Sequence, residues 1–212
     1  MANHVNIDKL RLAFLGVSHW HMVLFAPAIK SYGLNVVAVS DSDPAIAGAY
    51  AGEFKCKTYA DPKTLMEQER PDFVFAFDVH ADMAALCKTI ISEGIAFSME
   101  KPLGINAAEV REVKELAEKN GVFCSIPFIW RYSTLMREIK EKTSAEDFYN
   151  LSFNFICGPP SRYTDTSPWL LQNAKAGGGC MTNLGVHFMD MGYWLTESDD
   201  AEVLSAGYHY IN

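Results

Sequence analysis

Short apolar runs alternate with amphipathic segments along the first 127 residues. The runs with the length and composition of buried strands are Leu12–Gly16, Val36–Ser40, Phe73–Phe77, Ile95–Met99 and Val122–Ile126. The helices expected between them are His21–Tyr32, Pro44–Phe54, Asp61 to about Glu69, Ala81–Glu93 and Ala107–Asn120. Continuously apolar strands that alternate with helices predict a parallel sheet covered on both faces. We therefore expect a doubly wound α/β domain over residues 1–127.

The pattern changes after residue 127. Between Phe148 and Cys157, apolar and polar side chains alternate, which predicts one long strand with a single buried face, as in an antiparallel sheet. A Pro-, Ser- and Tyr-rich loop (Gly158–Pro168) follows, and then three glycines (Gly177–Gly179). A helix is expected from there to about Leu195, and a final strand at Glu202–Tyr210. Two strands leave the edges of a sheet uncovered. We therefore expect residues 128–212 to form an incomplete α+β domain with a mostly antiparallel sheet.

Composition and charge exclude several classes of protein. The net charge is −8 and no cluster of Lys or Arg is present, which argues against a nucleic-acid or anionic-membrane surface. A phosphate in a ligand must then be held by local geometry, such as backbone N–H groups at a helix start. No apolar run approaches the roughly 18 residues of a membrane span. The five cysteines form no C-x-x-C pair, and we expect a reduced, cytoplasmic setting.

The first strand-to-helix turn carries one of the three glycines typical of dinucleotide folds. It reads Gly16-Val-Ser18-His19-Trp-His21. The glycines of such folds provide a tight turn, close backbone approach to the pyrophosphate and close helix packing. Ser18 is small enough for a phosphate to approach. The alternative is an ordinary turn that ends in a surface histidine.

Other polar residues follow strands at the same edge of the predicted sheet. Asp41 follows the second strand, where dinucleotide folds carry an acid that binds the ribose and favours NAD over NADP. The alternative is a turn or N-cap aspartate. His80 lines the nicotinamide side of a cleft or is a plain loop histidine. Glu100-Lys101-Pro102 places a lysine at the strand end where open α/β sheets bind ligands. The alternative is that these residues are only the polar end of the strand. Pro102 makes a cis peptide bond with Lys101 possible.

A third group of polar residues lies after the three glycines. On a helix, Asn183, His187 and Asp190 share one face, and their neighbours are apolar. A polar stripe among apolar residues needs partners or a cleft. The alternatives are an N-cap role for Asn183 with a core His187, or a metal site built from His187, Asp190 and another histidine. No second motif supplies further metal ligands.

Together these motifs resemble the Gfo/Idh/MocA oxidoreductases, which include glucose–fructose oxidoreductase and inositol dehydrogenases. The shared features are, in order, the glycine turn, the acid at Asp41, E-K-P at 100–102, Trp130-Arg131-Tyr132, and G-G-G at 177–179 leading into N-x-G-x-H at 183–187 and Asp190. The resemblance implies a Rossmann domain for NAD, with NADP possible, and a C-terminal domain whose sheet forms a homo-oligomer interface. Family members are longer, so it also implies a chain that ends inside its second domain.

The resemblance further implies a dehydrogenase that acts on a secondary hydroxyl of a sugar, polyol or cyclitol. Lys101 would hydrogen-bond the hydroxyl, His187 would take its proton, and Asn183 stands where many members carry an assisting aspartate. The residues expected around the cofactor are Gly16, Ser18, His19, Asp41, His80, Glu100 and Lys101, with no metal.

Three features favour an alternative, a non-catalytic dinucleotide- or ligand-binding relative or an inactive fragment. The glycine turn is eroded, Asn183 cannot act as a base, and the C-terminal part is shorter than in family members. The residues do not identify the substrate, and we expect the 158–176 loop to contribute to its selection.

Overall fold

A computed structural model of the protein describes residues 7–207. The chain divides into two compact units. The first comprises Met1–Pro127 and Gly158–Asn183, and the second comprises Phe128–Cys157 and Leu184–Asn212. The sequence pattern had assigned every residue after 127 to the second domain, whereas the structure groups 158–183 with the first.

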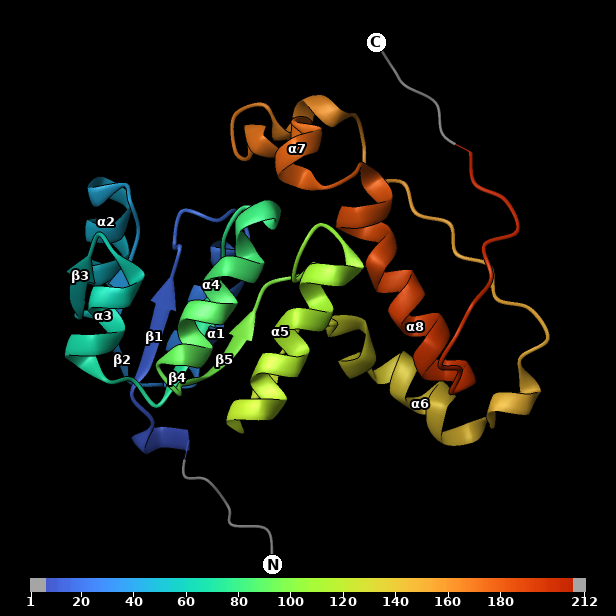
Figure 1. Ribbon diagram of the computed structural model, residues 1–212, viewed down its shortest axis with the longest axis horizontal. Coiled ribbons are helices and arrows are strands. Elements are labelled where there is room, and N and C mark those ends of the chain that lie inside the picture. Colours follow the sequence, from blue (N-terminus) through green and yellow to red (C-terminus); the bar gives the residue numbers. More distant parts are fainter. Residues whose placement is uncertain (1–6, 208–212) are drawn as a thin grey trace, which may run out of the picture. The chain divides into compact units, whose positions relative to one another are not determined.

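The first unit is built on a six-stranded parallel sheet (Figure 1). Its strands are β1 (Leu12–Leu15), β2 (Val36–Ser40), β3 (Lys57–Tyr59), β4 (Phe73–Ala76), β5 (Ala96–Met99) and β6 (Cys124–Ser125). Their order is β3-β2-β1-β4-β5-β6, so the chain winds outward in both directions from β1. The predicted parallel Rossmann sheet is confirmed. The apolar pattern did not mark β3, because this edge strand is short and its Lys57 and Thr58 are exposed.

The helices of the first unit begin and end at residues whose chemistry suits those positions. They are α1 (Met22–Ser31), α2 (Pro44–Phe54), α3 (Pro62–Glu69), α4 (His80–Ser92), α5 (Ala107–Asn120) and the short α7 (Asn173–Ala176). Asp43 and Asp61 accept backbone hydrogen bonds at the starts of α2 and α3, each followed by a proline in the first turn. Asn106 caps α5 in the same way, and Gly121 ends it in a left-handed conformation.

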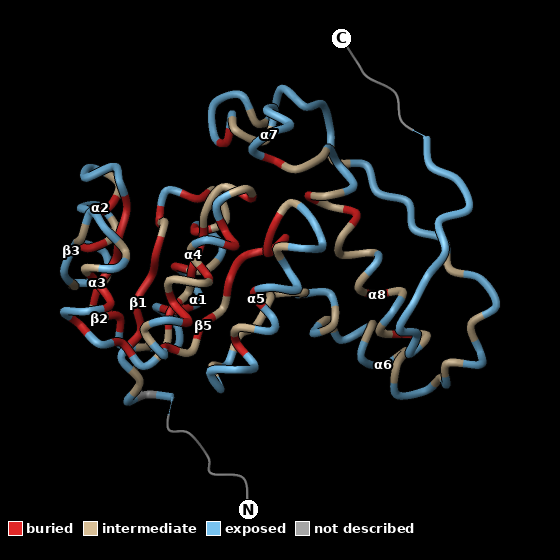
Figure 2. The backbone as a smooth tube through the Cα atoms, in the orientation of Figure 1, coloured by how far each residue is buried: buried red, intermediate tan, exposed pale blue. Residues whose placement is uncertain are grey.

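Helices cover the sheet from both sides, which creates two apolar cores. Along β1, Ala13 and Leu15 face the core that contains Met83 and Ile90 of α4, whereas Phe14 faces the core that contains Met22 of α1. The buried backbone in Figure 2 follows the strands and the inner sides of these helices. This packing places the carboxyl ends of all six strands at one edge of the sheet.

The segment 158–183 belongs to the first unit although it follows residues of the second. His80 at the start of α4 donates from Nδ1 to the carbonyl oxygen of Ala176, at 2.9 Å. Gly177, with φ +73°, lies so close to Ile105 that a Cβ would come within 2.3 Å of the Ile105 Cβ. The segment therefore attaches to the loops at the carboxyl edge of the sheet, where it is drawn in orange in Figure 1.

The second unit contains the helices α6 (Thr134–Lys142) and α8 (Val186–Thr196). Arg131 donates from Nε to Asp190 Oδ2 of α8 at 2.7 Å, and a second bond joins its Nη2 to Oδ1. Phe153 and Phe155 pack on Phe188, with ring centroids 5.3 and 5.6 Å apart.

The predicted antiparallel sheet is absent from the part of the chain that the structure describes. Residues 148–157 and 201–207 form no strand, and the end of the predicted strand Glu202–Tyr210 lies outside the described residues. Alternation gives a strand one apolar face, but a ladder also needs a hydrogen-bonded neighbour. Tyr149, Ile156 and Leu204 are almost fully exposed.

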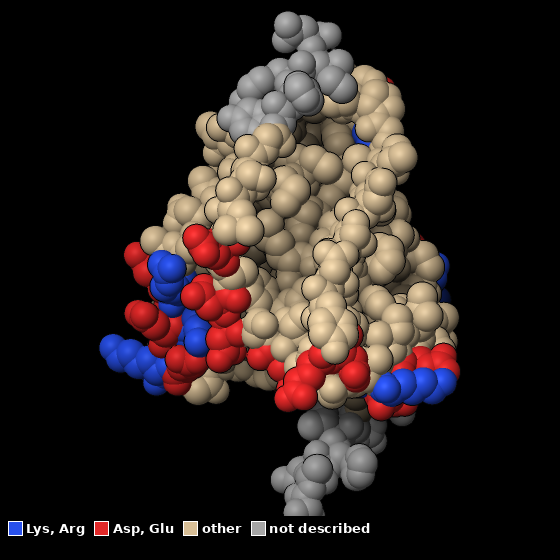
Figure 3. All heavy atoms as spheres, turned by 90° about the vertical axis from the view of Figure 1, so that its right-hand side faces the viewer, with Lys and Arg blue, Asp and Glu red and all other residues tan. Residues whose placement is uncertain are grey.

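In the view of Figure 3, the charged side chains gather in the lower part and the area above them is largely uncharged.

Within residues 7–207, no helix has the length and apolar character needed to cross a membrane.

Candidate functional site

The turn after β1 requires its single glycine. Gly16 has φ +76°, and a Cβ there would lie 2.2 Å from the carbonyl oxygen of Phe77. Its N–H donates to the carbonyl oxygen of Ser40 at 2.8 Å, which holds the turn against the end of β2. The predicted tight turn is therefore present, with the backbones of β1 and β4 in close approach.

Asp41, at the end of β2, is fixed against the same turn. Its Oδ2 accepts the Ser18 N–H at 2.6 Å, and its Oδ1 accepts the Asp43 N–H at 2.9 Å. Only 6% of the residue is exposed. A carboxylate oriented by two backbone donors, beside the turn, suits the recognition of ribose hydroxyls.

Two clefts share residues of the turn. The Asp41 cleft, about 540 Å³, is lined by Gly16, Ser18, His19, Ser40, Asp41, Ser42, Ile46, Ala60, Pro62, Phe77, Asp78, Val79, Leu86, Thr166 and Trp169. The Trp20 cleft, about 530 Å³, is lined by Val17, Ser18, His19, Trp20, Val23, Ile46, Tyr50, Arg162, Tyr163 and Thr166. Each falls in the size range of small-molecule sites, and both are lined by Ser18 and His19 of the turn.

Two buried polar atoms at the clefts lack a hydrogen-bond partner within the described protein, namely Nε2 of His19 and Oγ of Ser40. Burial lowers the pKa of His19 to about 3, so its ring is neutral. His19 Nδ1 accepts the His21 N–H at 3.2 Å, so the ring proton resides on Nε2, a donor without an acceptor. Unsatisfied buried polar atoms are costly, and a polar ligand would satisfy them. The residues therefore fit a dinucleotide.

Lys101 is buried at the carboxyl end of β5. Its Nζ donates to the carbonyl oxygen and to Oδ1 of Asn183, both at 2.9 Å. Burial lowers the pKa of Lys101, and the nearby Glu100 carboxylate opposes this shift. The peptide bond between Lys101 and Pro102 is cis, as the sequence allowed. Two candidate residues that lie 82 positions apart in the chain are thus in direct contact.

Glu100 and His80 are buried away from the clefts. Oε1 of Glu100 lies 3.1 Å from Nδ1 of His21. Burial raises the pKa of Glu100, but the hydrogen bond and charge of His21 and the charge of Lys101 more than offset this, and the net shift is downward. His80 is 1% exposed and held by Ala176. The expectation of a plain loop histidine is wrong, because His80 begins a helix and is buried.

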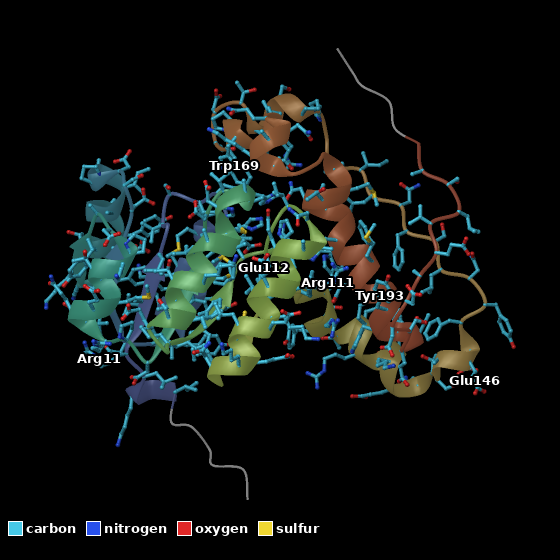
Figure 4. The ribbon with its side chains drawn as sticks, viewed as in Figure 1. Arg11, Arg111, Glu112, Glu146, Trp169 and Tyr193 are labelled. Carbon is cyan, nitrogen blue, oxygen red and sulfur yellow. The ribbon has the colours of Figure 1, made fainter. Side chains whose placement is uncertain are left out.

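Two aromatic residues of the returning segment were not predicted to take part in the site. Trp169, which is labelled in Figure 4, belongs to this segment. It packs edge-on against His80, with ring centroids 4.7 Å apart, and lies tilted to His19 at 6.1 Å. Tyr163 meets Trp20 edge-on at 6.1 Å, and its hydroxyl accepts a 3.4 Å hydrogen bond from Asn183 Nδ2. One feature of the sequence could have indicated them. The 158–176 loop contains aromatic residues, whereas surface loops are usually polar.

His187 and Asp190 belong to the second unit. The His187 ring packs edge-on against Phe128, at 6.0 Å between centroids. Asp190 forms an ion pair with Arg131. Its carboxylate therefore has a partner other than Asn183 and His187, with which it was predicted to form a polar stripe. Among residues 7–207, no group of His, Cys, Asp or Glu is arranged to hold a metal ion.

Residues 10–128, more than half of the chain, match the profile of the Gfo/Idh/MocA family, an oxidoreductase family with an NAD-binding Rossmann fold. The rhizopine catabolism protein MocA of Rhizobium meliloti is 26% identical over 197 residues, which cover 90% of this chain and 58% of that protein. The chain spans about half the length of the curated relatives it matches.

Solved structures share the fold. Myo-inositol 2-dehydrogenase from Lactobacillus plantarum aligns with a TM-score of 0.75 at 20% identity, over 89% of this chain and 56% of that one. The WlbA dehydrogenase from Thermus thermophilus, in complex with NAD and UDP-GlcNAcA, aligns with a TM-score of 0.73 at 22% identity, over 88% and 63%.

Proposed function

Because the chain belongs to the Gfo/Idh/MocA oxidoreductase family, we propose that it is an NAD-dependent dehydrogenase for a secondary hydroxyl of a sugar, polyol or cyclitol. The observation that carries this proposal is the buried Lys101, bonded to Asn183 at the sheet edge that also carries the Gly16 turn. An ammonium group has three donors, and Asn183 takes two. We propose that the third binds a substrate hydroxyl.

The residues proposed to hold the cofactor surround the turn. Gly16 and Ser18 allow close approach of the phosphates, Asp41 accepts hydrogen bonds from a ribose, and His19 offers its Nε2–H donor. The carboxylate of Asp41 repels a 2′-phosphate, which supports NAD over NADP. When bound, the nicotinamide accepts the hydride from the substrate carbon.

The remaining roles concern the substrate proton. Lys101 binds and orients the hydroxyl, and Asn183 holds Lys101 in place through both of its oxygens. The family resemblance alone supports His187 as the group that takes the hydroxyl proton, since imidazole titrates near neutral pH. Assembly into a homo-oligomer and a cytoplasmic setting also stay predictions.

A titration of NADH, followed by nicotinamide fluorescence, tests the first step. We expect saturable binding to the wild type, and turnover of at least one member of a panel of inositols and sugars. Lys101→Met should retain NADH binding but lose turnover by roughly 100-fold or more, as expected for a group that contacts the reacting hydroxyl. The exposed Lys175 provides the control, Lys175→Met, which should behave as the wild type. Absence of binding of both NADH and NADPH at millimolar concentration would contradict the proposal.

One observation favours a second function, a dinucleotide- or ligand-binding protein without turnover. Asn183, in direct contact with Lys101, is an amide and cannot act as a base at neutral pH. NADH binding without turnover of any substrate in the panel would support this alternative, whereas turnover by the wild type would exclude it.

A further inference from the structure

A dinucleotide brings two negatively charged phosphates to a cleft that already carries negative charge. Asp41 and Asp78 both line the Asp41 cleft. Like charges at short range oppose binding, most strongly where water is excluded. The net charge of the chain, −8, adds to this opposition. A positive group close to the turn would therefore strengthen the binding of the phosphates beyond what backbone N–H groups at the helix start supply.

The histidines of the turn do not supply that charge. His19 lines both clefts, but burial lowers its pKa to about 3 and its ring stays neutral at physiological pH. His21 is paired with Glu100 and lines neither cleft. Lys101 also lines neither cleft, and Asn183 holds it.

Arg162 is the one Lys or Arg that lines either cleft within the described chain. It comes from the returning segment and faces the Trp20 cleft, which shares Ser18 and His19 with the Asp41 cleft. A guanidinium group is permanently charged and matches phosphate oxygens with paired donors. The cation thus lines the cleft that shares Ser18 and His19 with the Asp41 cleft, whereas Asp41 and Asp78 line only the Asp41 cleft.

Side-chain contacts connect Arg162 to the turn and to Lys101. The Cζ of Arg162 lies 5.3 Å from the ring centroid of Tyr163, a cation–π distance. Tyr163 is held edge-on against Trp20 and by the hydrogen bond from Asn183. Asn183 in turn accepts from Lys101. The same set of contacts therefore connects the turn side of the cleft to the lysine.

We propose that Arg162 binds the pyrophosphate of the cofactor, at a turn that lacks the second and third glycines and the close backbone approach that they allow. This inference rests on the proposed function, because it presumes that the cleft takes a dinucleotide. It assigns a cofactor-binding role to a residue outside the alternating α/β domain, in the segment where substrate selection was expected.

Calorimetric titration with ADP-ribose and with adenosine separates the phosphate from the rest of the ligand. In the wild type, ADP-ribose should bind more tightly than adenosine. Arg162→Gln should weaken ADP-ribose binding on the order of 10- to 100-fold, since a charge-assisted hydrogen bond is lost, and should leave adenosine binding unchanged. Arg162→Lys should fall between the two. The control is Lys175→Gln, an exposed cation of the same segment that lines neither cleft.

Added salt offers an independent readout. Screening should weaken ADP-ribose binding to the wild type more than to Arg162→Gln. Equal affinity of wild type and Arg162→Gln for ADP-ribose, while NADH still binds, would overturn the role of Arg162 and leave the proposed function intact. An equal loss of adenosine and ADP-ribose binding would also overturn it, because the effect would not concern phosphate. Failure of the wild type to bind NADH, NADPH and ADP-ribose would overturn both.

Discussion

At the scale of single residues, Gly16 is constrained by its backbone conformation and by its neighbour. Its φ of +76° lies in the left-handed region, and a Cβ would lie 2.2 Å from a backbone oxygen that cannot move aside cheaply. We expect Gly16→Ala to lower the free energy of unfolding by more than about 2 kcal/mol. Urea denaturation measures the change.

Gly48 provides the matched control for this substitution. It lies exposed within α2, and a Cβ there would meet no atom within 4 Å. Gly48→Ala should stabilise the protein by about 0.5 to 1 kcal/mol, because alanine favours a helix interior. Equal effects of the two substitutions would show that the turn is not closely packed.

His80 makes stability depend on pH at the same scale. Burial lowers its pKa from 6.5 to about 4, against the opposing effect of its bond to Ala176. Between these values the unfolded chain takes up a proton that the folded chain excludes, so stability falls as pH falls from 6.5 towards 4. His80→Gln keeps an N–H donor but does not titrate. It should reduce the loss of stability between neutral pH and about pH 4.5 by about 2 kcal/mol.

Denaturation of wild type and His80→Gln at both pH values tests this expectation. The buried His19 also has a lowered pKa, so part of the acid sensitivity should remain in the variant. An unchanged pH dependence would mean that His80 is charged, or exposed, in the folded protein.

At the scale of elements, the attachment of the returning segment depends on the first of three consecutive glycines. Gly177 has φ +73° and its Cβ position is filled by Ile105. Gly177→Ala should loosen the segment and speed tryptic cleavage after Arg162 and Lys175. Gly179→Ala is the control, because a Cβ at Gly179 would meet nothing within 4 Å. Mass spectrometry of the fragments over time decides whether the two variants differ.

At the scale of the whole molecule, the two units differ in how much apolar surface they bury. Within residues 7–207, Met191 and Leu195 are the buried apolar side chains of the second unit, whereas the first contains two extended cores. We expect hydrogen exchange to be fast in residues 148–157 and 201–207 and slow in β1 and β4, because stability follows buried contacts. Slow exchange at 148–157 would indicate a strand with a partner, as the alternating pattern predicted.

Features that depend on neighbouring residues could be predicted from the amino-acid pattern. The alternation of strands and helices, the prolines that begin α2 and α3 after their capping aspartates, and the glycine turn are local or periodic signals. The same holds for the E-K-P motif at a strand end. Each of these features requires only the chemistry of a few adjacent side chains, and each can therefore be recognised without knowledge of the chain's path.

Contacts between residues far apart in the chain could be recognised only from the folded structure. The predicted polar stripe was divided, with Asn183 bonded to Lys101 and Asp190 paired with Arg131. The return of 158–183 to the first unit, which brings Arg162 to the clefts, had no periodic signal either. Such contacts join residues separated by tens of positions. Their free energy depends on how the intervening chain is routed and packed, which no local pattern encodes.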